Sequence, residues 1–246
     1  MIRAQNLNKA FGRKQVLTGV SFELAKGTSL VVIGGSGTGK SVLLKCLLGL
    51  ERADSGQVTV AGLVDPRPQT LAQHVGMLFQ GGALFDSLPV WQNVAFRLMR
   101  GPGRLGREAA RALAVEKLAR VGLGPDTADL FPAELSGGMQ KRVGLARAIA
   151  GEPPVLFFDE PTAGLDPIMA AVINALIREI VTEMGATAVT ITHDMRTLRD
   201  VADRVAMLHE GKFYWQGTAA EALSTDDPVM RQFTEGRTQG PIATLR

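Results

Sequence analysis

Apolar and polar positions along the chain predict an alternation of strands and helices. QVLTGVSFEL alternates apolar with polar positions, and Leu30–Ile33 is a short unbroken apolar run, so residues 1–33 favour strands. SGQVTVAGL (55–63) indicates a small hairpin strand. Such a pattern is typical of an α/β fold with a parallel sheet. Later strands are predicted at 155–158, 187–192 and 204–211, and helices at 42–48, 168–184 and 195–202.

The middle of the chain predicts helices only. A helix at 104–121 has an apolar face opposite a charged one, and a second helix runs from about 139 to 151. We therefore expect a helical subdomain at 82–151, inserted into a core formed by 1–81 and 152–223. The stretch 224–246 reads as an irregular tail. The expected apolar face of the first helix consists of Leu105, Ala109, Ala112, Leu113, Leu118 and Val121.

Composition and charge exclude several classes of protein. The 246 residues include 27 Lys plus Arg, 24 Asp plus Glu and one Cys, which gives a net charge of +3. The charges are interspersed, which argues against a nucleic-acid surface. A single cysteine and a polar start predict a reducing, cytoplasmic compartment. No apolar run approaches the roughly 18 residues of a membrane span, yet 46% of residues are hydrophobic. We expect partners to cover part of this apolar excess.

The glycine-rich segment after the first buried strand has the pattern of a phosphate-binding P-loop. Glycines let successive backbone N–H groups turn toward phosphate oxygens, and the following helix adds its positive end. Lys40 is expected to reach the β- and γ-phosphates, and Ser41 to offer its hydroxyl to Mg²⁺. The segment consists of Gly34, Gly35, Ser36, Gly37, Thr38, Gly39, Lys40 and Ser41.

A second buried strand ends in two acids. Val155–Phe158 is followed by Asp159 and Glu160. An acid at this strand end reaches the metal of a P-loop site, and the next carboxylate can orient and deprotonate water. The two motifs together predict a nucleoside triphosphatase.

Further motifs give a resemblance to the ABC ATPases. Leu135–Met139 (LSGGM) resembles their signature, and Gln80 their Q-loop glutamine. His193 resembles their switch histidine, and Phe11 stands where they carry an adenine-stacking aromatic ring. Met139 replaces the usual signature Gln, and Phe11 lacks the Tyr hydroxyl. The D-loop resemblance lies in Ala163, Gly164, Leu165 and Asp166.

The resemblance implies a composite site between two copies of the chain. Lys40, Glu160, Gln80 and His193 would act on ATP bound to their own subunit. Ser136, Gly137 and Gly138 would cap the γ-phosphate held by the second copy, again at a helix start. The implied cofactors are ATP and Mg²⁺. The implied metal ligands are Ser41, Gln80 and Asp159.

Two stretches narrow the resemblance to the Mla-type phospholipid transporters. They are GGALFDSLPVWQNVAFRL after Gln80 and the tail DDPVMRQFTEGRTQGPI. The family implies a homodimeric ATPase beneath an inner-membrane permease, with an MCE-domain protein and a STAS-domain subunit, on the cytoplasmic side. Transport of another substrate, or a non-transport ABC ATPase, stays open as an alternative. A permease groove would be lined by Phe85, Leu88, Val90 and Phe96.

The remaining polar candidates have simpler interpretations. Cys46 lies among leucines, which favours a packed thiol over a reactive one. His74 and His209 have no partners at metal-ligand spacing. The tail carries Val229, Met230, Phe233 and Ile242, which predict docking on a partner.

Overall fold

The computed structural model describes residues 1–101 and 103–242. Its internal contacts divide the chain into two units. The first consists of Met1–Leu71 together with the chain from Val189 onward, and the second of Ala72–Ala188. Each unit is described by itself below. Strand β8 (Thr187–Ile191), buried along its whole length, lies at the boundary.

The first unit begins with an antiparallel sheet of strand order β2-β1-β4-β5. In β2 the residues Val20, Phe22 and Leu24 are buried and alternate with exposed ones as the pattern predicts, and Ile2 and Ala4 of β1 are buried beside them. Ile2 lies opposite Leu24 on one side and Val60 on the other. The hairpin expected at 55–63 is confirmed. The strands are β1 (Ile2–Phe11), β2 (Lys14–Leu24), β4 (Ser55–Val60) and β5 (Leu63–Val64).

A second set of strands in this unit leads to the glycine-rich loop. β3 (Ser29–Ile33) is buried at every position and pairs in parallel with β9 (Arg204–His209). β10 (Lys212–Thr218), which the sequence pattern did not reveal, pairs antiparallel with β9. The helices of the unit are α1 (Lys40–Leu47), α2 (Pro68–Leu71), α7 (Met195–Val201), α8 (Ala219–Ser224) and α9 (Pro228–Glu235).

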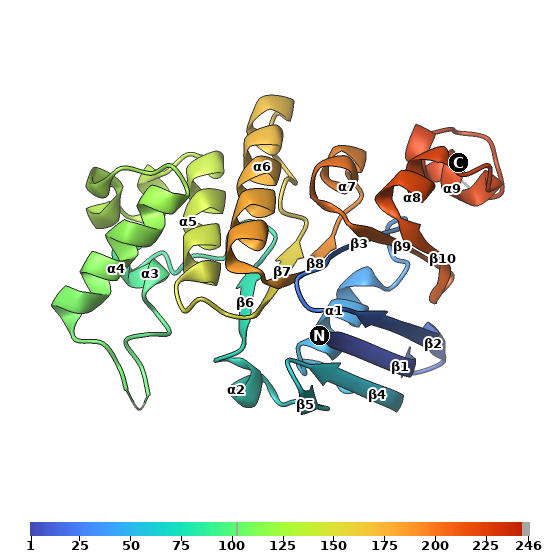
Figure 1. Ribbon diagram of the computed structural model, residues 1–246, viewed down its shortest axis with the longest axis horizontal. Coiled ribbons are helices and arrows are strands. Elements are labelled where there is room, and N and C mark those ends of the chain that lie inside the picture. Colours follow the sequence, from blue (N-terminus) through green and yellow to red (C-terminus); the bar gives the residue numbers. More distant parts are fainter. Residues whose placement is uncertain (102, 243–246) are drawn as a thin grey trace. The chain divides into compact units, whose positions relative to one another are not determined.

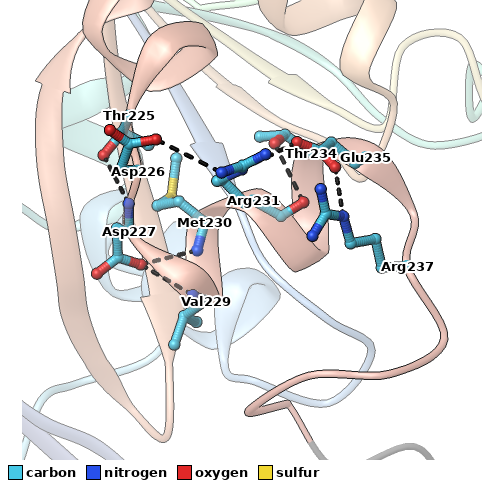
Figure 2. A network of polar contacts seen from close by, with 9 residues as sticks. All are labelled: Thr225, Asp226, Asp227, Val229, Met230, Arg231, Thr234, Glu235 and Arg237. Carbon is cyan, nitrogen blue, oxygen red and sulfur yellow. Dashed lines mark hydrogen bonds and ion pairs between the residues drawn. The ribbon is translucent and has the colours of Figure 1, made fainter.

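The expectation of an irregular tail is wrong for residues 228–235, which form α9. Figure 2 shows how the start of this helix is fixed: Asp227 accepts hydrogen bonds from the N–H groups of Val229 (3.0 Å) and Met230 (2.9 Å). Arg231 pairs with Glu235 (3.1 Å) one turn later. Gly236 ends the helix with a left-handed φ of 65°. An Asp cap, a Pro at the first position and a Gly after the last are standard helix boundaries.

Helix α9 covers the first unit's own core. Val229 and Met230 are buried in one cluster with Val31 and Ile33 of β3, and Phe233 and Ile242 pack against it. The expected partner docking by Val229 and Met230 is therefore wrong, because their side chains are already buried inside the chain. Residues 243–246 of the predicted tail lie outside the described residues.

In the second unit a helical group packs against two parallel strands. β6 (Val75–Leu78) pairs with β7 (Val155–Asp159) so that Leu78 lies opposite Phe158. Described residues between 82 and 151 form helices and loops (Figure 1); the subdomain boundaries stay a prediction. The helical elements are α3 (Val90–Val94), α4 (Arg107–Arg120), η1 (Pro125–Asp129), η2 (Pro132–Glu134), α5 (Gly137–Ile149) and α6 (Pro167–Met184).

The buried face of α4 differs from the expected one. Leu118 and Val121 are buried as expected, but Ala109 and Ala112 are exposed, and Ala110 and Ala114 are fully buried in their place. Lys117 joins this buried face, because its ammonium pairs with Glu152 (2.7 Å) while its methylenes pack below. Alanine gives a weak hydropathy signal, so neighbouring faces of the helix were hard to tell apart.

The packing of α5 on β6 leaves no room for a Cβ at two glycine positions. A Cβ on Gly76 in β6 would lie 2.1 Å from the carbonyl oxygen of Ala148 in α5 and 2.8 Å from a methyl of Leu156. A Cβ on Gly144 of α5 would lie 2.7 Å from a methyl of Leu78. Glycine at both positions therefore lets the helix backbone approach the strand that leads to Gln80.

We predict that Gly76→Ala lowers the free energy of unfolding by about 1–3 kcal/mol, because the added methyl must push α5 from β6. Urea unfolding followed by circular dichroism measures the change. Gly106→Ala is the control: at Gly106 φ is −64° and a Cβ would meet nothing within 4 Å. Equal stability of the two variants would contradict the close packing.

Candidate functional site

The loop between β3 and α1 is shaped by glycines in conformations that other residues avoid. Gly34, Gly37 and Gly39 have φ of 154°, 74° and 104°. A Cβ on Gly34 would lie 2.3 Å from the carbonyl oxygen of Leu208, and one on Gly39 2.8 Å from that of Val16. The loop is thus wedged between neighbouring backbone segments, and only glycine fits at these two positions.

Lys40 holds this loop from inside. Its ammonium donates to the carbonyl oxygens of Gly34 (2.7 Å) and Gly35 (2.8 Å), and the residue is only 9% exposed. The Thr38 hydroxyl donates to the same Gly35 carbonyl (3.0 Å). Ser36, Gly37 and Ser41 are exposed around this centre. A cation beside exposed backbone at a helix start is suited to a phosphate group.

Phe11 and His193 are the other expected site residues of the first unit. Phe11 ends β1 with its ring 48% exposed, and the Lys9 ammonium lies 5.0 Å from the ring centroid. His193 is exposed and directly follows Thr192, whose N–H donates to the Val32 carbonyl (3.2 Å). His193 therefore leaves the core beside the strand that carries the glycine-rich loop.

In the second unit the two strand ends bring the predicted polar residues to one edge. Leu78 pairs with Phe158 on the neighbouring strand, and Gln80 and Glu160 each come two residues after their paired strand residue. Asp159 and Glu160 are half-buried, whereas Gln80 is exposed. Glu160 has a left-handed φ of 47°, which is unusual for a residue with a side chain. The backbone therefore turns sharply away from the strand at this carboxylate.

Two basic residues of α5, which the sequence pattern did not single out, hold these loops. The Lys141 ammonium donates to the carbonyl oxygen of Glu160 (3.3 Å). Burial lowers the pKa of Lys141, and the charges of Asp159 and Glu160 oppose that shift. Arg147 donates to the carbonyls of Gly82 (2.7 Å) and Ala83 (2.8 Å) in the loop after Gln80.

The signature residues form an open helix start. The Ser136 hydroxyl accepts from the N–H of Met139 (3.3 Å), which caps α5. Ser136 and Gly137 are exposed, whereas Leu135 and Gly138 are buried and anchor the turn. The N-terminus of a 13-residue helix therefore faces outward and is able to receive an anion.

The D-loop residues lead into α6. Gly164 and Asp166 are exposed, and Ala163 and Leu165 are half-buried. The Asp166 carboxylate accepts from the N–H groups of Ile168 (2.9 Å) and Met169 (3.0 Å). Asp166 thus caps α6, a structural role that the family pattern did not reveal.

One of the four residues expected to line a permease groove lies in the interior instead. Val90 is fully buried in the helical group and is no surface residue. Phe85 is 42% exposed, and its ring stacks on that of Phe96 with centroids 4.2 Å apart. The Arg100 guanidinium lies over the Phe96 ring, 3.4 Å from its centroid. Phe85 and Phe96 thus form an aromatic pair, and Phe85 follows the loop residues Gly82 and Ala83 to which Arg147 donates.

The remaining polar residues carry no metal-binding pattern. Burial raises the pKa of the Cys46 thiol to about 11, so the packed interpretation is confirmed. His209 meets the edge of Tyr214 with ring centroids 6.0 Å apart. Within 1–101 and 103–242, no three His, Cys, Asp or Glu side chains are grouped as a metal site.

Comparison with known proteins decides the family. The family model described as ABC transporter matches residues 17–163. The protein trigalactosyldiacylglycerol 3, chloroplastic, of Arabidopsis thaliana is 40% identical over 98% of this chain and 75% of its own length. The chain belongs to the ABC transporter family. It is an ATP-binding subunit, and it hydrolyses ATP.

Other members of the ABC transporter family carry names with different substrates. The probable ribonucleotide transport ATP-binding protein mkl of Mycobacterium bovis is 39% identical over 98% of this chain and 68% of its own length. The methionine import ATP-binding protein MetN of Rhizobium johnstonii is 40% identical over 88% of this chain and 60% of its own.

A solved ABC cassette shares the fold. The dimeric post-hydrolysis state of the ATP-binding cassette MJ0796, bound to ADP and Pi, superposes with a TM-score of 0.80 at 29% identity. It covers 89% of this chain and 99% of its own. The predicted fold class, an α/β ABC ATPase core with an antiparallel part and inserted helices, is confirmed. No helix among the described residues is long and apolar enough to span a bilayer.

We predict that Lys40→Ala weakens ATP binding at least about a hundredfold, because it removes both the cation and the hydrogen bonds to Gly34 and Gly35. Titration with a fluorescent ATP analogue measures the affinity. Lys45→Ala, an exposed lysine on the same helix, is the control and should bind normally. Unchanged affinity of Lys40→Ala would remove Lys40 from the phosphate site.

Proposed function

We propose that two copies of this chain bind two Mg·ATP between them and drive a permease that moves phospholipid between the inner and outer membranes of a Gram-negative bacterium. The two halves of the nucleotide site support the first part. One half holds a buried ammonium inside a glycine loop, and the other presents an open helix start at Ser136. Of the second part, the diacylglycerol lipid in the name of the Arabidopsis relative supports a lipid substrate.

In this proposal each copy holds its own nucleotide through the glycine-rich loop. Lys40 and the loop backbone bind the β- and γ-phosphates, and the exposed face of Phe11 stacks on adenine. Ser41, Gln80 and Asp159 offer hydroxyl, amide and carboxylate oxygens, the donor type that Mg²⁺ prefers, and would hold the ion. When bound, Mg²⁺ neutralises negative charge on the β- and γ-phosphates.

The second copy completes the site with its signature turn. Ser136 and Gly137 are exposed on a helix start, so they are available to a γ-phosphate brought by another molecule. Gly138 and the D-loop residues Ala163–Asp166 would line the same dimer contact. The related cassette MJ0796 is dimeric in the presence of ADP and Pi, which supports a homodimer.

Hydrolysis then follows from the acidic strand end. A water oxygen attacks the γ-phosphorus, the bond to the β–γ bridging oxygen breaks, and the carboxylate of Glu160 takes the water proton. Gln80 and His193 would sense or position the γ-phosphate. Loss of phosphate and reopening of the dimer would move the loop that Arg147 holds, and with it the permease.

The choice of phospholipid as substrate combines the name of one relative with the resemblance of two stretches. The relative named for a diacylglycerol lipid aligns with 98% of this chain, as does the relative named for ribonucleotide transport, whereas the Rhizobium methionine importer aligns with 88%. The resemblance of the stretch 81–98 and of the tail to the Mla-type phospholipid transporters supports the same substrate. The partners would be an inner-membrane permease, an MCE-domain protein and a STAS-domain subunit, with this chain on the cytoplasmic side. Amino-acid import is the second candidate, favoured by the methionine relative.

We predict that Glu160→Gln keeps ATP binding and lowers turnover at least about a hundredfold, because the amide cannot accept the water proton. It should also trap a dimer in the presence of ATP, which size-exclusion chromatography detects. Glu152→Gln is the matched control, since Glu152 has the same left-handed φ of 47° but pairs with Lys117. Undiminished phosphate release by Glu160→Gln would exclude Glu160 as the base.

We predict that the native complex, purified from membranes through an affinity tag on this chain, contains a permease, an MCE-domain protein and bound phospholipid. Mass spectrometry of proteins and of extracted lipids measures both. An amino-acid-binding protein in place of the MCE protein, with no enriched lipid, would overturn the lipid assignment in favour of amino-acid import.

A further inference from the structure

We propose that Lys141 is a positioning residue for hydrolysis: its ammonium fixes the left-handed turn at Glu160 and thereby aims the Glu160 carboxylate. The inference rests on the proposed role of Glu160 as the base. It depends on contacts within the second unit alone, since Lys141, Asp159 and Glu160 all belong to it.

The first observation is the conformation at Glu160. A residue with a Cβ in the left-handed region is strained by about 1–2 kcal/mol, so surrounding contacts must hold it there. The Glu160 carbonyl accepts from the N–H of Ala163 (3.2 Å), which closes a turn, and from the Lys141 ammonium (3.3 Å). The second bond ties the turn to α5, from 19 residues earlier in the chain.

The second observation is the burial and charge of Lys141. The residue is only 4% exposed, although a lysine on a helix surface ordinarily reaches water. Its ammonium is close enough to feel the charges of both Asp159 and Glu160. A buried cation beside two adjacent carboxylates offsets their mutual repulsion and keeps both in place.

The third observation is the position of Lys141 on α5. The same helix begins at the signature residue Ser136 and holds the Gln80 loop through Arg147. A shift of α5 that accompanies a ligand at Ser136 would therefore reach Glu160 through Lys141. Lys141 thus gives the turn at Glu160 a direct connection to the signature end of the helix.

The chain offers a matched control for a buried lysine. Lys117 in α4 is 3% exposed and pairs with Glu116 (3.0 Å) and Glu152 (2.7 Å) in the same unit, but it contacts no predicted site residue. Lys141→Met and Lys117→Met remove the same charge from equally buried places. If both variants lose stability but only Lys141→Met loses turnover, the effect on hydrolysis is distinct from the cost of removing a buried lysine.

The experiment compares kcat and KM for ATP in the full-length chain. We expect Lys141→Met to lower kcat about tenfold or more with KM changed less than about threefold, since the phosphate-binding loop is untouched. Lys141→Gln, which removes the charge and shortens the reach by one bond, is a milder second variant and should lower kcat by an intermediate factor. Lys117→Met should keep the parent kcat.

Amide hydrogen exchange gives a readout independent of turnover. Peptides covering 159–166 should exchange faster in Lys141→Met than in the parent or in Lys117→Met, because the turn has lost its hydrogen bond from Lys141. A folded Lys141 variant of either kind with kcat equal to that of Lys117→Met, or unchanged exchange at 159–166, overturns the inference.

The Glu160→Gln variant distinguishes a failure of the proposed base, Glu160, from a failure of the positioning role of Lys141. If Glu160→Gln loses turnover and Lys141→Met does not, only the positioning role fails. If Glu160→Gln keeps turnover while Lys141→Met loses it, the proposed base is wrong, and Lys141 does not act through it.

Discussion

The close approach of α5 to β6 is the constraint on which the second unit depends. At Gly76 a Cβ would lie 2.1 Å from the Ala148 carbonyl oxygen, and at Gly144 a Cβ would lie 2.7 Å from a methyl of Leu78, so glycine at both positions lets the helix approach the strand that leads to Gln80. Interiors packed at this density deform little. Because one rigid helix also begins at Ser136 and carries Lys141 and Arg147, the geometry of three site segments follows from one contact.

Strand pairing and helix α5 each fix a different part of the geometry of the site in the second unit. Parallel pairing of Leu78 with Phe158 is enough to bring Gln80 and Glu160 to one edge of the sheet. Pairing does not fix the direction in which each loop leaves the strand. Hydrogen bonds from Arg147 and Lys141 to loop carbonyls supply that direction.

Sequence patterns predicted the segments with strong local signals. The glycine-rich loop, the buried strand before Asp159 and the helix start at Ser136 each follow from spacing and residue type alone. Lys141 was missed because a lysine in an amphipathic helix resembles a solvent-facing residue, whereas in the structure it is buried and donates to the Glu160 carbonyl. Helix α9 was missed although its boundary residues, Asp227, Pro228 and Gly236, were present in the sequence. The site roles themselves stay predictions, since they require nucleotide and a second copy.

Helix α9 packs against β3, so the C-terminal part of the chain supports the strand that precedes the glycine-rich loop. Met230 shares a core with Val31 and Ile33 of β3, the strand that leads into Gly34. A proteolytic cut or a shortened expression clone that removes the last twenty residues would therefore strip apolar cover from the strand behind the nucleotide loop. Loss of ATP turnover in such a protein would report a loosened core, and would be easily mistaken for the loss of a regulatory tail.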